Sequence, residues 1–369
     1  MSIEKPFLRD GVDVYVRRDD EIQFVFLSTR RRLIVKASVP LIHALAWLDG
    51  QHTTSELQER FAATYGASRR QDFAAFLDYL QHHGIVVERD WLSQMGLTPD
   101  VLETQQRQLN FLLDVLETPQ KVAAAQGRIS RARIVIFGAG AVGSWTVRLL
   151  LGLGFRCFTL VDHDTMNPSD VARHAFADTD ALVSGRQKTE WLARLIEDEF
   201  SGATVRAVTS PLSMETDLSS VIDTHTSLVI NAADEPYIGY TSVLLSRFCI
   251  PRRLPLLVAG GFDAHLASVG EMIIPGVTPC ADCYAEHFRV ALADWRPFPH
   301  PVTDRRDGFG GLCSLSVFSA AAAAMSVLRL FAFDDHVAIG GRGELLFDDY
   351  RLDRFKVERQ PGCPYCGNL

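Results

Sequence analysis

This sequence lacks both a strong excess of one charge and a long hydrophobic run. Of its 369 residues, 37 are Lys or Arg and 45 are Asp or Glu, so the formal net charge is −8. Such a small acidic excess argues against a general binder of nucleic acid or of anionic membranes. Within the longest uncharged stretch, the apolar segment Leu312 to Leu328 is shorter than the roughly 20 residues of a membrane span. We interpret it as a buried helix.

Signs of secretion, disorder and internal repetition are also missing. Met1 to Pro6 has no apolar core behind a basic start, so neither a signal peptide nor a mitochondrial presequence is indicated. Apolar residues make up 47% of the chain and charged residues 22%, a balance that excludes a disordered protein. We therefore expect a cytoplasmic globular protein of two or three domains, with no nucleic-acid or membrane partner.

Cysteine is scarce, and the number of cysteines is odd. Four of the seven form two Cys-x-x-Cys pairs, Cys280 with Cys283 and Cys363 with Cys366. In a reducing compartment such pairs are typical of metal sites, and four thiolates suit a tetrahedral structural Zn²⁺. Two redox pairs or four free thiols are the alternatives. Cys313 follows a flexible stretch and opens the Ala-rich helix, where it is either a covalent nucleophile or a buried thiol.

The first ninety residues predict a small α+β domain. Three short β-prone segments lie between residues 14 and 37, separated by charged turns. Thr53 and Glu56 then form a capping box that opens a helix, and a later helix carries apolar residues at i, i+3, i+4 and i+7 from Phe73. We expect a winged-helix-like module whose aromatic stripes form its core.

From residue 132 onward the pattern changes to alternating strands and helices. The β-prone runs are Ile134–Phe137, Cys157–Val161, Val205–Val208, Ser227–Asn231 and Leu256–Ala259. This alternation predicts an α/β fold with a Rossmann-like parallel sheet. The expected organisation is a small domain over residues 1–92, a helical connector over 93–130 and an α/β domain over 131–369.

A glycine-rich turn follows the first of these strands. Gly138, Gly140 and Gly143 allow the turn to close and the backbone to approach a phosphate at a helix N-terminus, where free N–H groups and the helix dipole favour negative charge. Asp162 ends the next strand, where its carboxylate can accept hydrogen bonds from ribose hydroxyls. These features alone would fit a nicotinamide-dependent dehydrogenase.

A second set of residues, which hydride transfer does not need, changes this interpretation. In chain order it consists of Asp162-His163-Asp164, the stretch Ser169 to His174 with its Arg173, then Lys188 and Asp234. This ordered set resembles the ThiF/MoeB superfamily, the adenylating enzymes related to ubiquitin activators, over residues 128–369. A dehydrogenase becomes the minor alternative. One departure is Asp170, which stands where the family usually has asparagine.

The resemblance implies the reaction and its cofactors. Such enzymes join a carboxylate oxygen to the α-phosphorus of ATP and expel pyrophosphate, with Mg²⁺ and positioned cations balancing the negative charge on the phosphates. By the resemblance, Asp162 and Asp164 belong to the nucleotide site with the three glycines, Arg173 and Lys188 bind phosphates, and Asp234 coordinates Mg²⁺. The resemblance also implies that the four paired cysteines are structural zinc ligands, because the family carries such pairs at the same points.

Arg107 is the remaining candidate for the catalytic set. It matches the family's N-terminal arginine, which reaches into the partner subunit's site, and a homodimer is expected from the same resemblance. The alternative for Arg107 is a solvated charge on a helix.

The N-terminal domain resembles the PqqD-like recognition domains of peptide-modifying enzymes. The resemblance rests on the string Leu48 to Thr53 and on the Leu-x-x-x-Gly-Ile pattern from Leu80 to Ile85. In such domains a leader peptide adds as a strand to the edge of the meander and packs on the third helix. Here the peptide would lie between residues 32–37 and the helix over 71–80.

The whole arrangement most resembles the MccB-type enzymes of microcin C biosynthesis and the related pantocin A enzyme. It implies a protein that binds a ribosomally made precursor peptide by its leader and adenylates a core carboxylate or carboxamide, leading to cyclisation or nucleotide attachment. Two other functions remain open. One is an activator of a ubiquitin-like sulfur carrier, in which Cys313 would be essential, and the other is a leader-binding scaffold without catalysis.

Overall fold

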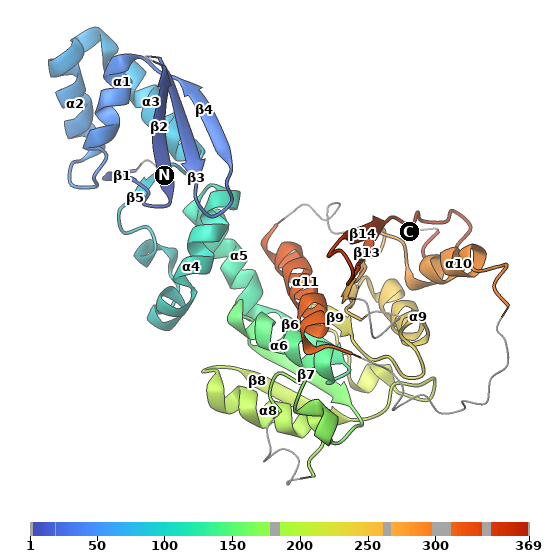
Figure 1. Cartoon of the computed structure of the whole chain (residues 1–369). Helices are drawn as coiled ribbons and strands as arrows, with labels where there is room; N and C mark the ends of the chain where they lie inside the picture. The colour runs from blue at the N-terminus through green and yellow to red at the C-terminus, as the bar shows by residue number, and fades with distance from the viewer. Residues whose placement is uncertain are drawn as a thin grey trace. The chain divides into compact units, whose positions relative to one another are not determined.

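The chain divides into two units, Met1–Gly127 and Arg128–Leu369 (Figure 1). The computed structural model describes residues 3–18, 20–177, 185–260, 267–296, 311–333 and 341–367. The expected connector forms two helices, α4 (Pro99–Leu116) and α5 (Pro119–Arg131), and the division falls within α5.

The strands of the first unit form two small antiparallel sheets. Their bounds are β1 (Pro6–Leu8), β2 (Val12–Arg18), β3 (Glu21–Phe26), β4 (Arg32–Lys36) and β5 (Val86–Glu88). The predicted meander is confirmed, with strand order β2-β3-β4 (Figure 1). The second sheet pairs β1 with β5, so the N-terminal segment is tied to the strand that follows the third helix.

Helices cover one face of the meander. They are α1 (Val39–Ala44), α2 (Thr54–Tyr65) and α3 (Arg70–His82), with short 3₁₀ turns at Leu45–Trp47, Ala67–Arg69 and Ser93–Met95. The predicted capping box is present, since Glu56 N–H donates to Thr53 Oγ1 and Thr53 N–H donates to the Glu56 carboxylate. Phe61 and Phe73 stack in the core with ring centroids 4.7 Å apart. The aromatic stripes are therefore core, as expected.

The second unit is built on a six-stranded sheet with strand order β12-β10-β9-β6-β7-β8. Its strands are β6 (Arg133–Phe137), β7 (Cys157–Asp162), β8 (Thr204–Thr209), β9 (Leu228–Asn231), β10 (Leu256–Val258) and β12 (Met272–Ile273). All neighbours pair in parallel except β12, which runs antiparallel to β10. The predicted Rossmann-like sheet is confirmed.

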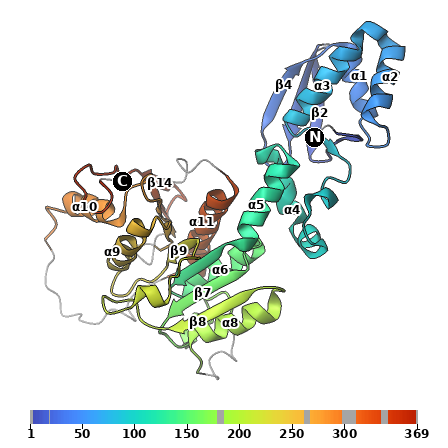
Figure 2. The same ribbon diagram turned by 180° about the vertical axis from the view of Figure 1, so that it is seen from behind.

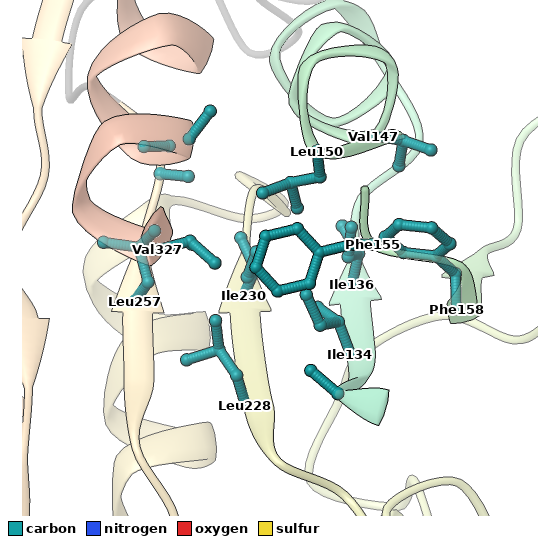
Figure 3. Close-up of a cluster of buried hydrophobic side chains, with 14 of the residues drawn as sticks. Ile134, Ile136, Val147, Leu150, Phe155, Phe158, Leu228, Ile230, Leu257 and Val327 are labelled. Carbon is teal, nitrogen blue, oxygen red and sulfur yellow. The ribbon is translucent and has the colours of Figure 1, made fainter. Parts of the chain in front are cut away.

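Helices cover both faces of this sheet (Figure 2). They are α6 (Ala141–Gly152), α8 (Lys188–Glu199), α9 (Ile238–Cys249), α10 (Ala281–Ala291) and α11 (Cys313–Ala332), with 3₁₀ turns at Pro168–Asp170, Leu218–Ser220 and Ile250–Arg252. On one face α6, α8 and α11 bury the side chains of alternate strand residues (Figure 3). On the other face α9 and α10 pack on the intervening residues.

Helix α11 is the apolar stretch that the sequence singles out. By length and composition it could cross a membrane. In the structure it packs beside α6, and its Ala323, Ala324 and Val327 lie in the core over the sheet (Figure 3). The interpretation as a core helix agrees with this packing.

A third small sheet completes the second unit. It joins β11 (Ala267–Val269), β13 (Arg342–Leu345) and β14 (Leu352–Phe355) in antiparallel order. Arg342 and Glu271 form a buried ion pair beside it, with Nη1 and Oε2 3.0 Å apart.

Candidate functional site

The sheet order places the topological switch point, where open α/β sheets form their ligand crevice, at the carboxyl ends of β6 and β9. From β6 the chain builds outward to β7 and β8 and then crosses back to β9 on the other side, so the loops after β6 and β9 lead in opposite directions. In open α/β sheets ligands bind at such a switch point. The glycine turn follows β6, and Asp234 follows β9.

The three predicted glycines play two different roles. Gly138 has φ +90°, and a Cβ there would lie 2.5 Å from the Ala232 backbone. A Cβ on Gly143 would lie 1.9 Å from the Gly138 carbonyl oxygen. Both positions therefore need glycine so that the turn can close. At Gly140, by contrast, a Cβ would have no heavy atom within 4 Å, which leaves open space at the N-terminus of α6.

Asp162 ties this turn to the end of β7. Its Oδ2 accepts a hydrogen bond from Ala139 N–H at 2.6 Å, and its Oδ1 accepts one from Asp164 N–H at 2.8 Å. A carboxylate has about four acceptor positions, so Asp162 retains capacity for ribose hydroxyls, its predicted partners.

Lys188 lies at the start of α8 within a group of carboxylates. Its ammonium is 2.9 Å from Asp164 Oδ2 and 3.7 Å from Asp170 Oδ2, and its side chain is 4% exposed. Arg173 reaches the same buried carboxylate, with Nη2 3.3 Å from Asp170 Oδ1. The structure thus brings the two predicted phosphate-binding cations together around Asp170.

His174 ends the predicted motif stretch, but the sequence does not reveal the contact that it makes. Its Nε2 lies 2.9 Å from the Ala139 carbonyl oxygen, and its Nδ1 accepts from Phe176 N–H at 3.2 Å. Burial lowers the pKa of His174 to about 4, against the opposing effect of the Ala139 hydrogen bond. The ring is therefore neutral at pH 7, with Nε2–H donating to Ala139. No spacing marks this contact in advance, because it joins segments 35 residues apart.

Asp234 follows a buried polar network at the end of β9. The Asn231 amide donates to Thr241 and Ser242 at 3.0 Å each and accepts from Ala233 N–H at 3.1 Å. Although Asp234 is exposed, the surrounding protein partly desolvates its carboxyl and raises its pKa. The Asp162 carboxylate raises it further, whereas the cations Arg173 and Lys188 lower it.

Two further candidates lie in different places. Arg107 is exposed on α4 of the first unit, and its role in a partner's site stays a prediction. Cys313 begins α11, and its Sγ is 3.8 Å from the Arg173 carbonyl oxygen. The thiol thus lies against the backbone of the segment that carries Arg173.

The four paired cysteines form a single buried cluster. Sγ–Sγ distances are 3.8 Å for Cys280–Cys283 and 3.5 Å for both Cys280–Cys363 and Cys283–Cys366. A tetrahedron of thiolates about 2.3 Å from Zn²⁺ has edges of about 3.8 Å. The cluster therefore suits a closed structural zinc site and joins the start of α10 to the C-terminal segment.

Without a bound cation, the thiols of the cluster differ in how tightly they hold their protons. Burial raises the pKa of Cys280, and it raises that of Cys283 to about 11. Burial opposes the shift at Cys363, but hydrogen bonds from the Cys366 and Tyr365 backbone lower its pKa to about 7. A bound cation would displace the remaining protons.

The ThiF family model matches residues 107–341, which covers the sheet, the glycine turn and the cation cluster. The chain belongs to the ThiF family. It is an E1-like adenylating enzyme, and ATP is the nucleotide typical of this family.

Two known proteins are similar to this one over about two thirds or more of its chain. The heterocyst protein HesA of Trichormus variabilis is 25% identical over 281 residues, covering 74% of this chain and 92% of HesA. The sulfur carrier protein ThiS adenylyltransferase of Bacillus subtilis is 24% identical over 251 residues, 66% of this chain and 67% of that enzyme.

Two solved structures match nearly the whole chain. E. coli MccB with MccA-N7isoASN has a TM-score of 0.71 at 17% identity, covering 98% of this chain and 99% of MccB. PaaA has a TM-score of 0.72 at 18% identity, and the match covers 95% of this chain and 100% of PaaA. At these identities the likeness shows the fold, and it includes the first unit.

Proposed function

We propose that this protein is a cytoplasmic enzyme that binds a ribosomally made precursor peptide by its leader and adenylates a carboxylate or carboxamide in the peptide's core. Cyclisation or nucleotide attachment would follow, as in the biosynthesis of peptide antibiotics. The proposal rests on two parts of one chain, an adenylating unit and a second unit that mostly precedes the ThiF match.

The observation that carries the peptide proposal is the open edge of β4. Phe26 N–H donates a hydrogen bond to Arg31 O, and Ala37 N–H donates one to Asp20 O. The backbone N–H and C=O groups of the odd-numbered residues of this strand therefore point toward β3. Since backbone groups alternate sides along a strand, the N–H and C=O groups of Arg32, Ile34 and Lys36 point to the other side. Among the described residues no strand pairs with that side. A peptide strand can therefore add there.

The side chains of β4 support the same use. Leu33 and Val35 pack against the core to which α3 contributes Phe73 and Phe76. Ile34 is 49% exposed, and Arg32 and Lys36 beside it are exposed as well. The edge thus offers apolar and cationic side chains next to free backbone groups. MccB, whose structure with its peptide MccA is known, has the same fold across this unit.

For the chemical step, Lys188 and Arg173 are the cations that would meet the phosphates, and Asp162 would hold the ribose. Asp234, near enough to Asp162 to interact with it electrostatically, fits a Mg²⁺ ligand because oxygen donors are what this ion prefers. A bound Mg²⁺ would offset the negative charge of the phosphates. Arg107 would act in the site of a second copy, in the homodimer proposed for this chain.

Pyrophosphate release tests the proposal. The wild-type chain should release pyrophosphate from ATP only when a cognate peptide is present, with peptides encoded by short reading frames next to the gene as probes. Asp234→Ala should abolish release without lowering the melting temperature, since Asp234 is exposed. Absence of peptide-dependent release with every such peptide would contradict the proposal.

A second candidate is an activator of a ubiquitin-like sulfur carrier. It is favoured by the position of Cys313 beside the Arg173 segment and by the likeness to the ThiS adenylyltransferase. Under it, Cys313→Ala abolishes product formation, whereas the peptide proposal expects wild-type pyrophosphate release from the same variant. A scaffold without catalysis predicts that the chain binds the peptide but not ATP.

A further inference from the structure

Asp170 is the least exposed charged residue of the nucleotide crevice. Its side chain is 0% exposed, whereas those of Asp164 and Arg173 next to it are 45% and 48% exposed. A carboxylate is buried at low cost only when cations or hydrogen-bond donors satisfy it. Its partners therefore indicate what the charge does.

The Asp170 carboxylate divides its two oxygens between three groups. Oδ2 accepts from Asn167 N–H at 3.0 Å and lies 3.7 Å from the Lys188 ammonium, and Oδ1 lies 3.3 Å from Arg173 Nη2. The bond to Asn167 closes a capping box around the 3₁₀ turn Pro168–Asp170. Both oxygens thus have partners, and the carboxylate links the turn to the two cations.

The capping bond alone does not require a carboxylate. An asparagine side chain has a carbonyl oxygen that accepts equally from Asn167 N–H, and it has the same shape. What only the carboxylate adds is a negative charge between Lys188 and Arg173. Lys188 has three donors, one of which goes to Asp164, and Arg173 has five, so each cation keeps donors for a ligand while Asp170 lies beside it.

The charge balance of the crevice shows a second effect of this residue. Four carboxylates, those of Asp162, Asp164, Asp170 and Asp234, surround the two cations Lys188 and Arg173. With all groups ionised the set is negative by two charges. An uncharged residue at position 170 would leave it negative by one and would therefore repel an anionic ligand less.

We propose that Asp170 is a positioning residue that holds Lys188 and Arg173 oriented for the phosphates of ATP, and that its charge weakens the binding of ATP without metal. The inference rests on the proposed use of these cations in adenylation. Asp170 acts through the two cations and does not touch the substrate. Preorganised charges act in a transition state without the cost of reorientation, so the effect belongs in kcat.

The test compares Asp170→Asn with the wild-type chain. The asparagine keeps the shape and the bond to Asn167 but removes the charge. We expect kcat for peptide-dependent pyrophosphate release to fall about tenfold with little change in KM for the peptide. In a calorimetric titration in EDTA, ATP should bind several-fold more tightly to the variant. A merely structural role predicts no tighter binding.

Asp114→Asn is the matched control. Asp114 is a buried carboxylate of the first unit, with Oδ1 2.6 Å from Arg9 Nη2, so the same change removes a buried charge from the unit that does not carry the crevice. It should lower the melting temperature and leave ATP affinity unchanged. Asp170→Asn with wild-type kcat, or with equal or weaker ATP binding in EDTA, would overturn the proposal. Should no peptide support release, the proposed function fails, and the EDTA titration still tests Asp170.

Discussion

The imidazole of His174 and the carbonyl of Ala139 are 2.9 Å apart, and this contact ties the segment carrying Arg173 to the middle of the glycine turn. One side of the proposed phosphate-binding region is thus fixed to the other by a neutral, buried ring. The contact has a measurable dependence on pH.

Stability should fall with acid because of His174. In the unfolded chain its imidazole takes up a proton near pH 6.5, but in the folded chain only near pH 4. The folded state therefore binds fewer protons, and the stabilisation is complete above pH 6.5 and is lost as the pH falls toward 4. Urea unfolding should show that the wild-type chain loses roughly 3 kcal/mol more over this range than His174→Gln. Parallel pH profiles would contradict this assignment.

Alanine at two glycines should separate packing from ligand approach. Gly143→Ala places a Cβ against the Gly138 carbonyl oxygen, so the variant should lose several kcal/mol of stability and bind no ATP. Gly140→Ala meets open space and should keep the stability within about 0.5 kcal/mol. Its ATP affinity should nevertheless fall at least tenfold, because a methyl group would stand where the phosphates approach. Calorimetric titration and thermal melting measure both. If Gly140→Ala binds ATP with wild-type affinity, the phosphates do not bind at this turn.

Zinc should be present and structural. Elemental analysis of the purified chain should find one zinc per molecule, and Cys366→Ser should lose it, with a melting temperature lower by about 10 °C. Cys249→Ala is the control, because Cys249 is buried in the same core but lies outside the cluster. It should retain zinc. A metal-free wild-type chain that is as stable as the holoprotein would argue for free thiols.

Proline on β4 should distinguish peptide binding from folding. Ile34→Pro removes an N–H that points to the open edge, whereas Val35→Pro removes one that faces β3. Proline is tolerated at edge positions of the first kind. We expect Ile34→Pro to abolish binding of the cognate peptide with a small change in melting temperature. Val35→Pro should instead destabilise the first unit. Retained binding in Ile34→Pro, measured by fluorescence anisotropy, would exclude strand addition at this edge.

Much of this fold could be predicted because its signals are local. The strands near Ile134 and Phe158 are apolar runs that end at glycine or aspartate, and the Thr53 capping box is encoded within four residues. Pairing of β1 with β5 could not be predicted, since three-residue strands have too little pattern and their partners are far apart in the chain.

The sequence could predict which residues form the site, but not which contacts each of them makes there. Motif order places Lys188 and Arg173 in one site, yet the carboxylate between them, Asp170, appears in the sequence only as a departure from a family pattern. The roles of Gly138 and Gly140 differ through backbone neighbours that come from the loop after β9. Such contacts depend on tertiary packing, which no spacing records.

The cysteine cluster also has a topological consequence. By joining Cys283 to Cys363 through a shared ion, it would close a loop of roughly 80 residues that contains the whole of α11. Closing a loop of that length removes chain entropy from the unfolded state rather than adding contacts to the folded one. Helix α11 begins at Cys313, whose thiol lies against the carbonyl of Arg173. The metal would therefore restrict the conformational freedom of a helix whose first turn borders the nucleotide crevice.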